Sequence, residues 1–91
     1  MKITLHGTFM GVKNRTQKKY LDNGQVKQVL VPYIHLYDGE DIIPIKIDES
    51  DTVQEFSSLA TGDNIEVCCE LNIFNGNAYF KVWEGGENNV Q

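Results

Sequence analysis

The side chains best suited to bind a ligand lie in the second strand-like run of the chain. Ile34 and Leu36 are expected to face the core of the protein. The opposite face of the same strand then carries three side chains in a row, namely Tyr33, His35 and Tyr37. Exposed tyrosine rings stack on any nucleobase, with roughly 1–3 kcal/mol per base. The row predicts a stacking platform for unpaired nucleic acid; alternatively, the tyrosines form cross-strand pairs or lie under a neighbouring subunit.

Cationic side chains gather in the first predicted hairpin. They flank Tyr20 and the turn that follows it, and they are Lys13, Arg15, Lys18, Lys19 and Lys27. Lys46 is a further candidate on the third strand. Such cations neutralise phosphates and release counterions, which makes affinity fall steeply with salt. The hairpin therefore predicts a phosphate-binding arm; the alternative is a solvated edge that lysines protect from aggregation.

The last predicted hairpin offers two more aromatic rings. Phe74 takes the outward parity near the turn, and Tyr79 shares one face of the final strand with Lys81 and Trp83. Phe74 or Tyr79 is expected to stack on a base or to hold a second copy of the chain, whereas Trp83 is expected to pack.

No pattern in the chain predicts an enzyme, a metal site or a cofactor. The chain has no nucleophile elbow, phosphate loop or HExxH motif. Its clustered acids fit turns and a helix start. Cys68 and Cys69 are neighbours in a strand and point to opposite faces, so one buried and one surface thiol are expected rather than a disulfide or a zinc site.

Three turn dipeptides divide the chain into strands. Asn23-Gly24, Asp38-Gly39 and Asn75-Gly76 reach positive φ at little energy, as two-residue hairpin turns require. They predict strands over about residues 2–20, 25–37, 41–48, 63–74 and 77–84.

One short helix is predicted between the second and third of these hairpins. Thr52 and Glu55 match a capping box at its start, and Gly62 stands where a helix ends. Val53, Phe56 and Leu59 form its apolar stripe, which must pack on the sheet because so short a helix is not stable alone. The resulting order is β-β-β-α-β-β in an all-β domain.

Alternating apolar residues in every strand leave the sheet with one face to cover. Gly7 and Gly11 interrupt the first strand where a sheet bends or another backbone approaches closely. A five-stranded barrel capped by the helix covers the apolar face and hides the strand edges. The alternative is an open sheet with the helix across one face.

This pattern resembles the OB-fold. The carriers of the resemblance are the glycine-bent first strand, the position of the helix and the segment Leu59-Ala60-Thr61-Gly62-Asp63-Asn64-Ile65-Glu66-Val67, and it covers residues 2–84. The small size and the long first hairpin are most similar to single-stranded DNA-binding proteins of phages and mobile elements. The resemblance implies an OB-type barrel with its nucleic-acid surface on strands two and three and on the neighbouring loops.

The charge of the chain is unevenly distributed. The net charge is −5, yet residues 1–27 hold six cations and one acid, whereas residues 28–91 hold two cations and twelve acids. This excludes indiscriminate polyanion binding but permits a local phosphate surface. No apolar run spans a membrane and no signal peptide is visible, so a cytoplasmic protein is expected, with a domain over residues 1–84 and a flexible polar tail over residues 85–91.

These observations predict a sequence-tolerant single-stranded DNA-binding protein without catalytic activity. One domain covers about 4–16 nucleotides, so a homodimer or larger homo-oligomer is expected. The alternatives are a protein-interaction module that docks a replication or host protein, and an RNA-binding domain.

Overall fold

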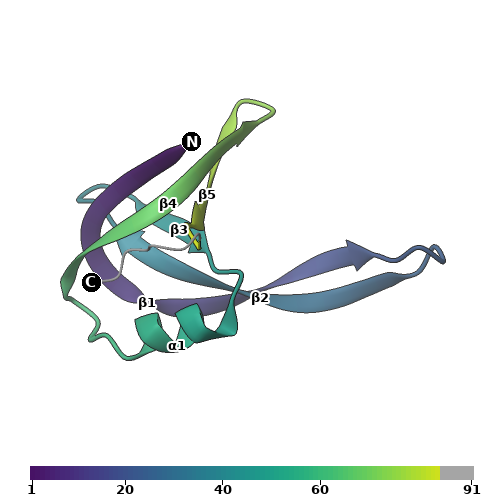
Figure 1. Ribbon diagram of the computed structural model, residues 1–91, viewed down its shortest axis with the longest axis horizontal. Helices are drawn as coiled ribbons and strands as arrows, with labels where there is room; N and C mark the ends of the chain where they lie inside the picture. The colour runs from purple at the N-terminus through teal and green to yellow at the C-terminus, as the bar shows by residue number, and fades with distance from the viewer. Residues whose placement is uncertain (85–91) are drawn as a thin grey trace.

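The computed structural model describes residues 1–84, which form five strands and one short helix (Figure 1). Their bounds are β1 (Lys2–Tyr20), β2 (Val26–Tyr37), β3 (Ile42–Lys46), α1 (Ser50–Ser57), β4 (Asn64–Phe74) and β5 (Asn77–Val82). The predicted order of elements is confirmed. The predicted tail, residues 85–91, lies outside the described residues. Within the described part, no helix has the length and apolarity needed to cross a membrane.

The strands form a single sheet in the order β1-β2-β3-β5-β4. All pairings are antiparallel except that of β3 with β5, which is parallel and joins only two residue pairs. β1 pairs with β4 through its first half and with β2 through the rest, so the circuit of pairings is closed. The sheet therefore has an inner side, which holds the core, and an outer side.

Residue partners follow a staggered path around this sheet. Starting on β1 and crossing β2, β3, β5 and β4 in turn, the path runs through Lys13, Tyr33, Lys46, Lys81, Glu70 and Lys2. It returns to β1 at a different residue from its start, so the strands are sheared relative to one another, as closure of a sheet requires. All six side chains share the outer side because directly paired residues point to the same face.

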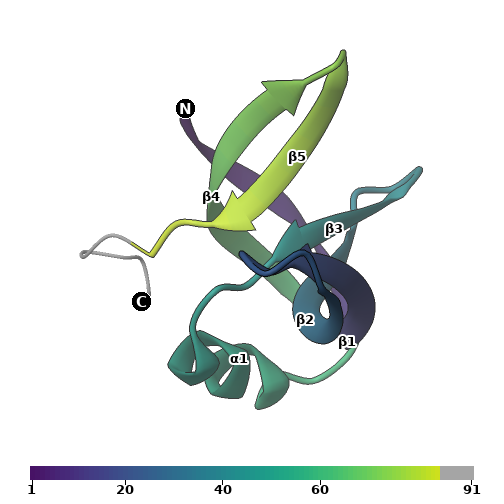
Figure 2. The same cartoon turned by 90° about the vertical axis from the view of Figure 1, so that its right-hand side faces the viewer.

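The core forms from the inward side chains of all five strands. It contains Phe9, Ile34, Leu36, Ile45, Ile47, Val67, Cys69 and Val82. Val53, Phe56 and Leu59 pack against it from the helical segment, as their spacing predicts. α1 thereby covers one end of the sheet (Figures 1 and 2).

The two glycines of β1 serve the two purposes expected of strand glycines. A Cβ atom on Gly7 would lie 2.5 Å from the carbonyl oxygen of Tyr37, so the backbones approach too closely for any side chain. Gly11 has φ +112° and lies in a bulge between Phe9 and Val12. The bulge inserts an unpaired residue and inverts the alternation, so that Val12 rather than Gly11 packs against the core.

Only one of the three turns is the predicted two-residue turn. Asn75 and Gly76 have φ of 53° and 79°, and Phe74 pairs with Asn77 across them. The other loops are longer, and within each only the glycine has positive φ.

In the first hairpin the amide of Leu21 donates to the carbonyl of Gln25, which closes a three-residue loop. In the second, Asp38 Oδ1 accepts from the amides of Glu40 and Asp41, at 2.8 Å each, and these bonds lower the pKa of Asp38. The side-chain acceptor makes the four-residue loop stable without a second positive φ.

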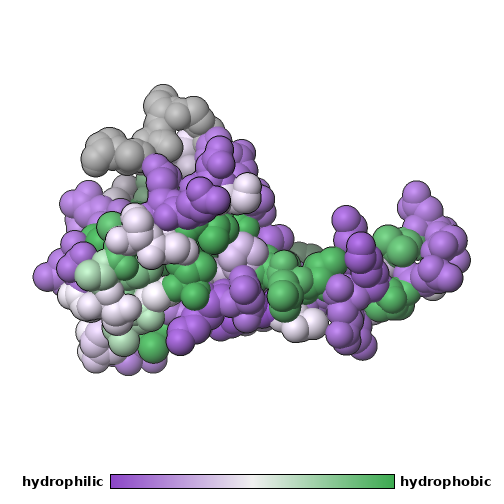
Figure 3. Space-filling model, turned by 90° about the horizontal axis from the view of Figure 1, so that it is seen from below, coloured by the Kyte–Doolittle hydropathy of each residue, from purple (hydrophilic) through white to green (hydrophobic). Residues whose placement is uncertain are grey.

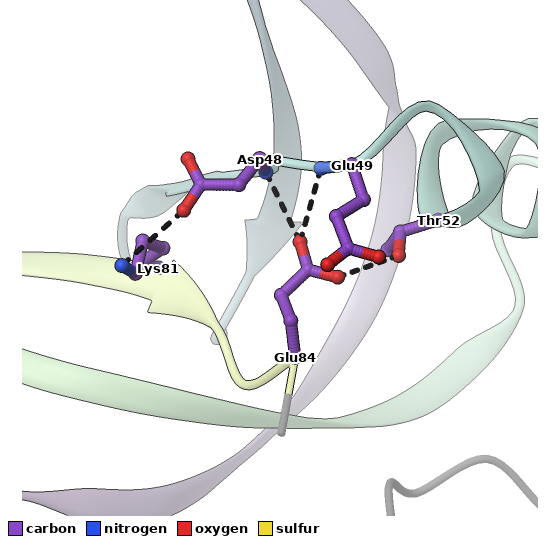
Figure 4. A network of polar contacts seen from close by, with 5 residues as sticks. All are labelled: Asp48, Glu49, Thr52, Lys81 and Glu84. Carbon is purple, nitrogen blue, oxygen red and sulfur yellow. Dashed lines mark hydrogen bonds and ion pairs between the residues drawn. The ribbon is translucent and has the colours of Figure 1, made fainter. Parts of the chain in front are cut away.

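The predicted capping box is wrong. The helix begins at Ser50 with Glu49 at the N-cap position and no side-chain cap bond from it. Thr52 therefore lies inside the first turn, where its hydroxyl donates to Glu84 Oε1 at 2.7 Å. Glu84 Oε2 accepts from the amides of Asp48 and Glu49 (Figure 4). A carboxylate from beyond β5 replaces the local partner that the sequence motif suggests.

Gly62 does not end the helix. The C-cap residue is Ser58, in a right-handed conformation. Gly62 has φ +104° and donates its amide to the carbonyl of Phe9, while the amide of Phe9 donates to the carbonyl of Asp63, both at 2.8 Å. These two bonds attach the loop before β4 to β1.

The two cysteines are free and lie in different environments. Cys69 is fully buried and Cys68 is partly exposed, as their alternation predicts. Burial raises the pKa of Cys69 to about 12, so its thiol stays protonated and packs as an apolar group.

Candidate nucleic-acid interface

The row on β2 lies on the outer side of the sheet, as predicted. Ile34 and Leu36 are fully buried, and the three side chains between and beside them point the other way. Tyr37 is 39% exposed, and Tyr33 and His35 are partly exposed. The rings are therefore accessible from solvent rather than enclosed in the core.

Tyr33 is held in place by two side chains of β1. The Arg15 guanidinium lies over its ring, 4.9 Å from the centroid, and Gln17 Nε2 donates to its hydroxyl at 2.7 Å. These are cross-strand contacts, as the alternative interpretation of the tyrosine row as cross-strand pairs expects. They also place a cation directly against an accessible aromatic ring, an arrangement suited to a base with its phosphate.

His35 is the least suitable member of the row for binding phosphate. Burial first, then the charges of Arg15 and Lys13, lower the pKa of His35. Its Nε2 atom is buried and has no hydrogen-bond partner among the described residues. The imidazole is therefore neutral at pH 7 and contributes a ring surface but no charge.

Tyr37 stands apart from Tyr33. Four residues of strand separate the two by about 13 Å, so one base cannot contact both rings. The Tyr37 hydroxyl donates to the carbonyl of Gly39 at 2.9 Å, which fixes the ring beside the second loop.

The first hairpin extends beyond the closed sheet as a two-stranded arm, residues 14–32 (Figure 1). Because the bulge at Gly11 inverts the alternation of β1, Lys13 and Arg15 point to the same outer side as Tyr33. Lys19 lies six residues from Lys13 and directly opposite Lys27, so both of these lysines share that side as well. Four cations and one tyrosine are thereby brought together.

Lys18 and Tyr20 lie on the other side of the arm, which corrects the expectation of one cationic group around Tyr20. Tyr20 pairs with Val26, and Leu30 lies on the same face. These three side chains are 74%, 51% and 68% exposed, respectively. Figure 3 shows separate hydrophobic patches on the arm between hydrophilic stretches. A nucleic-acid strand that lies along the outer side of the sheet would not contact this face of the arm.

Sheet register extends the outer surface to the last hairpin. Tyr33 pairs with Lys46, and Lys46 pairs with Lys81 across the parallel β3–β5 junction. Tyr79, two residues before Lys81, shares its face and is 53% exposed; Phe74, on the same face, is 66% exposed. We call this surface the outer band: Lys13, Arg15, Lys19, Lys27, Tyr33, Lys46, Lys81, Tyr79 and Phe74.

Lys81 was not among the phosphate-binding candidates that the sequence suggests. Its place beside Lys46 depends on the parallel pairing of β3 with β5, whose residues are 35 apart in the chain. No local pattern encodes that junction, whereas the alternation of β5 does indicate that Lys81 and Tyr79 share a face. Trp83 is partly buried with Lys2 Nζ 5.1 Å from its ring centroid, in keeping with the packing role expected of it.

The chain was compared with protein-family models, curated proteins and solved structures. None of them matches. The interface therefore rests on its geometry and chemistry. One other feature lies away from the outer band, an open hollow on β1 and β4 that is lined by His6, Gly7, Asn64, Ile65 and Glu66. Among residues 1–84, no three His, Cys, Asp or Glu side chains are grouped closely enough to hold a metal ion.

Proposed function

We propose that this chain forms an OB-type barrel that binds single-stranded DNA along the outer band without base preference. The strand order β1-β2-β3-β5-β4, the parallel β3–β5 pair and a helix between β3 and β4 support the assignment of the fold. OB-folds bind oligonucleotides on the face of strands two and three. In this chain that face carries Tyr33, Lys46 and Tyr37.

The single observation that carries the proposal is the environment of Tyr33. Lys13 and Lys46 flank it on the two neighbouring strands, and Arg15 covers its ring. An aromatic surface between cations matches the alternation of base and phosphate in an unpaired strand. A base stacks on Tyr33 in exchange for Arg15, whose guanidinium then binds the adjacent phosphate.

The remaining residues of the outer band lengthen the binding surface in two directions. Lys19 and Lys27 bind phosphates along the arm. Tyr79 and Phe74 stack bases on the last hairpin. Tyr37, which lies outside the outer band on the same side of β2 as Tyr33, stacks a base beside the second loop. Lys18 and Tyr20 are excluded because they lie on the opposite face of the arm, and His35 is excluded as a phosphate ligand because its lowered pKa leaves it uncharged.

Self-association and a cytoplasmic location complete the proposal. One domain covers about 4–16 nucleotides, so continuous coating of a strand requires a homodimer or larger assembly. Two free cysteines fit a reducing compartment. A phage or mobile element supplies unpaired DNA there during its replication.

A protein-interaction module is the second candidate function. The observation that favours it is a set of exposed apolar side chains on one face of the arm, Tyr20, Val26 and Leu30, with Lys18 and Gln28 between Leu30 and the other two. Unpartnered apolar side chains on a projecting hairpin are typical of contact surfaces, and a replication or host protein is the partner class. The two candidates use opposite faces of one arm, so variants on each face separate them.

The test compares two tyrosines on opposite faces, the partly exposed Tyr33 and the exposed Tyr20. Titration of labelled oligo(dT) at low salt is expected to show binding that weakens as salt rises. Tyr33→Ala should weaken it by about 5- to 150-fold, the equivalent of roughly 1–3 kcal/mol of stacking. Tyr20→Ala is the matched control and should change affinity by less than about twofold.

Two outcomes contradict the proposal. If oligo(dT) does not bind even at low salt, single-stranded DNA is not the ligand. Equal effects of Tyr33→Ala and Tyr20→Ala reject the outer band as the surface. Competition by a matched oligo(rU) that equals oligo(dT) would instead favour the RNA-binding alternative.

A further inference from the structure

The cation next to Lys46 on the outer band is paired with an acid of its own chain. Lys81 Nζ lies 3.2 Å from Asp48 Oδ2 (Figure 4). The hydrogen bond and charge of Asp48, with smaller contributions from Glu70 and Glu84, raise the pKa of Lys81. Lys81 is therefore fully charged, but its charge is neutralised locally. Among residues 1–84, Lys46 forms no ion pair.

Asp48 is held beside Lys81 by contacts that do not involve its own carboxylate. Its backbone amide donates to Glu84 Oε2 at 3.1 Å, and the amide of Glu49 donates to the same oxygen at 3.2 Å. The other oxygen of Glu84 accepts from the Thr52 hydroxyl. Figure 4 shows Glu84 between the turn and the helix, with the Asp48 carboxylate directed away from it toward Lys81. The hydrogen bonds to Glu84 thus fix the backbone that carries the Asp48 carboxylate.

The pair is accessible to a competing anion. The side chains of Lys81 and Asp48 are 38% and 41% exposed. An exposed ion pair of this kind is only weakly stabilising because water screens it. A phosphate oxygen makes the same charge-assisted contact with an ammonium group, so it can take the place of the carboxylate.

We propose that the Asp48 carboxylate occupies a phosphate site formed by Lys81 and Lys46, and that a bound DNA strand places a phosphate there by displacing Asp48. This inference rests on the proposed function of the outer band. The exchange leaves a carboxylate beside the incoming phosphate, so Lys81 contributes less to affinity than an unpaired lysine does. Asp48 is therefore a built-in competitor that weakens binding and lowers its salt dependence.

The test removes the charge of Asp48 and keeps its shape. Asp48→Asn is expected to bind oligo(dT) about fivefold more tightly at low salt, the equivalent of one exposed pair. The slope of log K against log salt should steepen by about 0.7, which corresponds to one more phosphate of a single strand. Asp51→Asn is the matched control because it changes the net charge by the same amount. Asp51 is exposed in the first turn of α1 and forms no ion pair with any of residues 1–84.

A double-mutant cycle assigns the gain to Lys81. In the Asp48→Asn background Lys81→Ala should abolish the whole fivefold gain. In the wild-type background it should weaken binding by less than that, because Asp48 already neutralises part of the charge of Lys81. Equal affinity and slope for Asp48→Asn and Asp51→Asn overturn the inference, as does a gain that survives Lys81→Ala. If wild type binds with salt dependence, the proposed function stands in either case. If wild type does not bind, the proposed function and this inference both fail.

Discussion

Tyr33 is ordered by neighbouring side chains in the free protein. The Arg15 guanidinium covers its ring and Gln17 fixes its hydroxyl, both from the neighbouring strand. These contacts hold the ring in one orientation, so a base that replaces Arg15 meets a surface that is already ordered. Less conformational entropy is lost on binding than with a free side chain.

His35, two residues further along β2, makes the stability of the protein depend on pH. Its pKa lies below the ordinary 6.5 because burial, Arg15 and Lys13 disfavour the charged form. The unfolded chain therefore takes up a proton before the folded protein does. The free energy of unfolding is therefore highest, as far as His35 affects it, above pH 6.5. It decreases as the pH falls through the lower pKa of His35 in the folded state.

We expect wild type to lose more unfolding free energy than His35→Gln as the pH falls from about 7.5 to about 5.5. Urea unfolding of both proteins at each pH measures this difference. The carboxylates are the same in both proteins, so their contribution cancels. Parallel pH profiles would show that His35 titrates as it does in an unfolded chain.

In the arm, the β-bulge at Gly11 determines which side chains lie on which face. The bulge at Gly11 places Lys13, Arg15 and Lys19 on the outer side of β1 and leaves Lys18 on the other. Without the extra residue, strict alternation from Phe9 would point Lys13 and Arg15 to the inner side, away from Tyr33. The bulge therefore aligns the cations with the aromatic ring.

Neighbouring lysines on the arm are expected to differ in their effect on binding. Lys19→Ala should reduce the salt slope of oligo(dT) binding by about 0.7, because one phosphate contact is lost. Lys18→Ala removes the same charge from the opposite face and should leave the slope nearly unchanged. Titrations at four or more salt concentrations measure both slopes. Identical slopes would mean that the strand senses only the net charge of the arm.

At the scale of the whole molecule, the closed sheet and the arm differ in how they are stabilised. Residues 2–9 of β1 lie against β4 and the core, whereas residues 14–20 pair only with β2. A two-stranded hairpin without further cover is marginally stable in water. The arm thus carries the cations on the least protected part of the fold, which suits the proposed binding of a flexible DNA strand.

Hydrogen exchange should divide β1 into two parts. We expect the hydrogen-bonded amides of residues 14–20 to exchange about tenfold or more faster than those of residues 3–9, because the arm opens locally without unfolding the sheet. Bound oligo(dT) should slow exchange in the arm. Uniform protection along all of β1 would indicate that the arm is covered in solution, for example by a second copy.

Local signals in the sequence determined the elements of this protein. Period-two alternation placed the five strands, the spacing of Val53, Phe56 and Leu59 placed the helix against the core, and alternation around Ile34 and Leu36 put Tyr33 on the outer side. These features depend on residues a few positions apart, whose steric and hydrophobic preferences act within one strand or turn. Nothing beyond neighbouring residues is needed to predict them.

The tertiary structure alone decided which residues form one surface. The bulge changed the face of every later residue of β1, the β3–β5 junction brought Lys81 beside Lys46, and Glu84 replaced the predicted capping box. Each of these depends on a contact between distant segments that forms only when the whole sheet forms. Such contacts follow from the register and packing of the whole sheet, which no short stretch of sequence specifies.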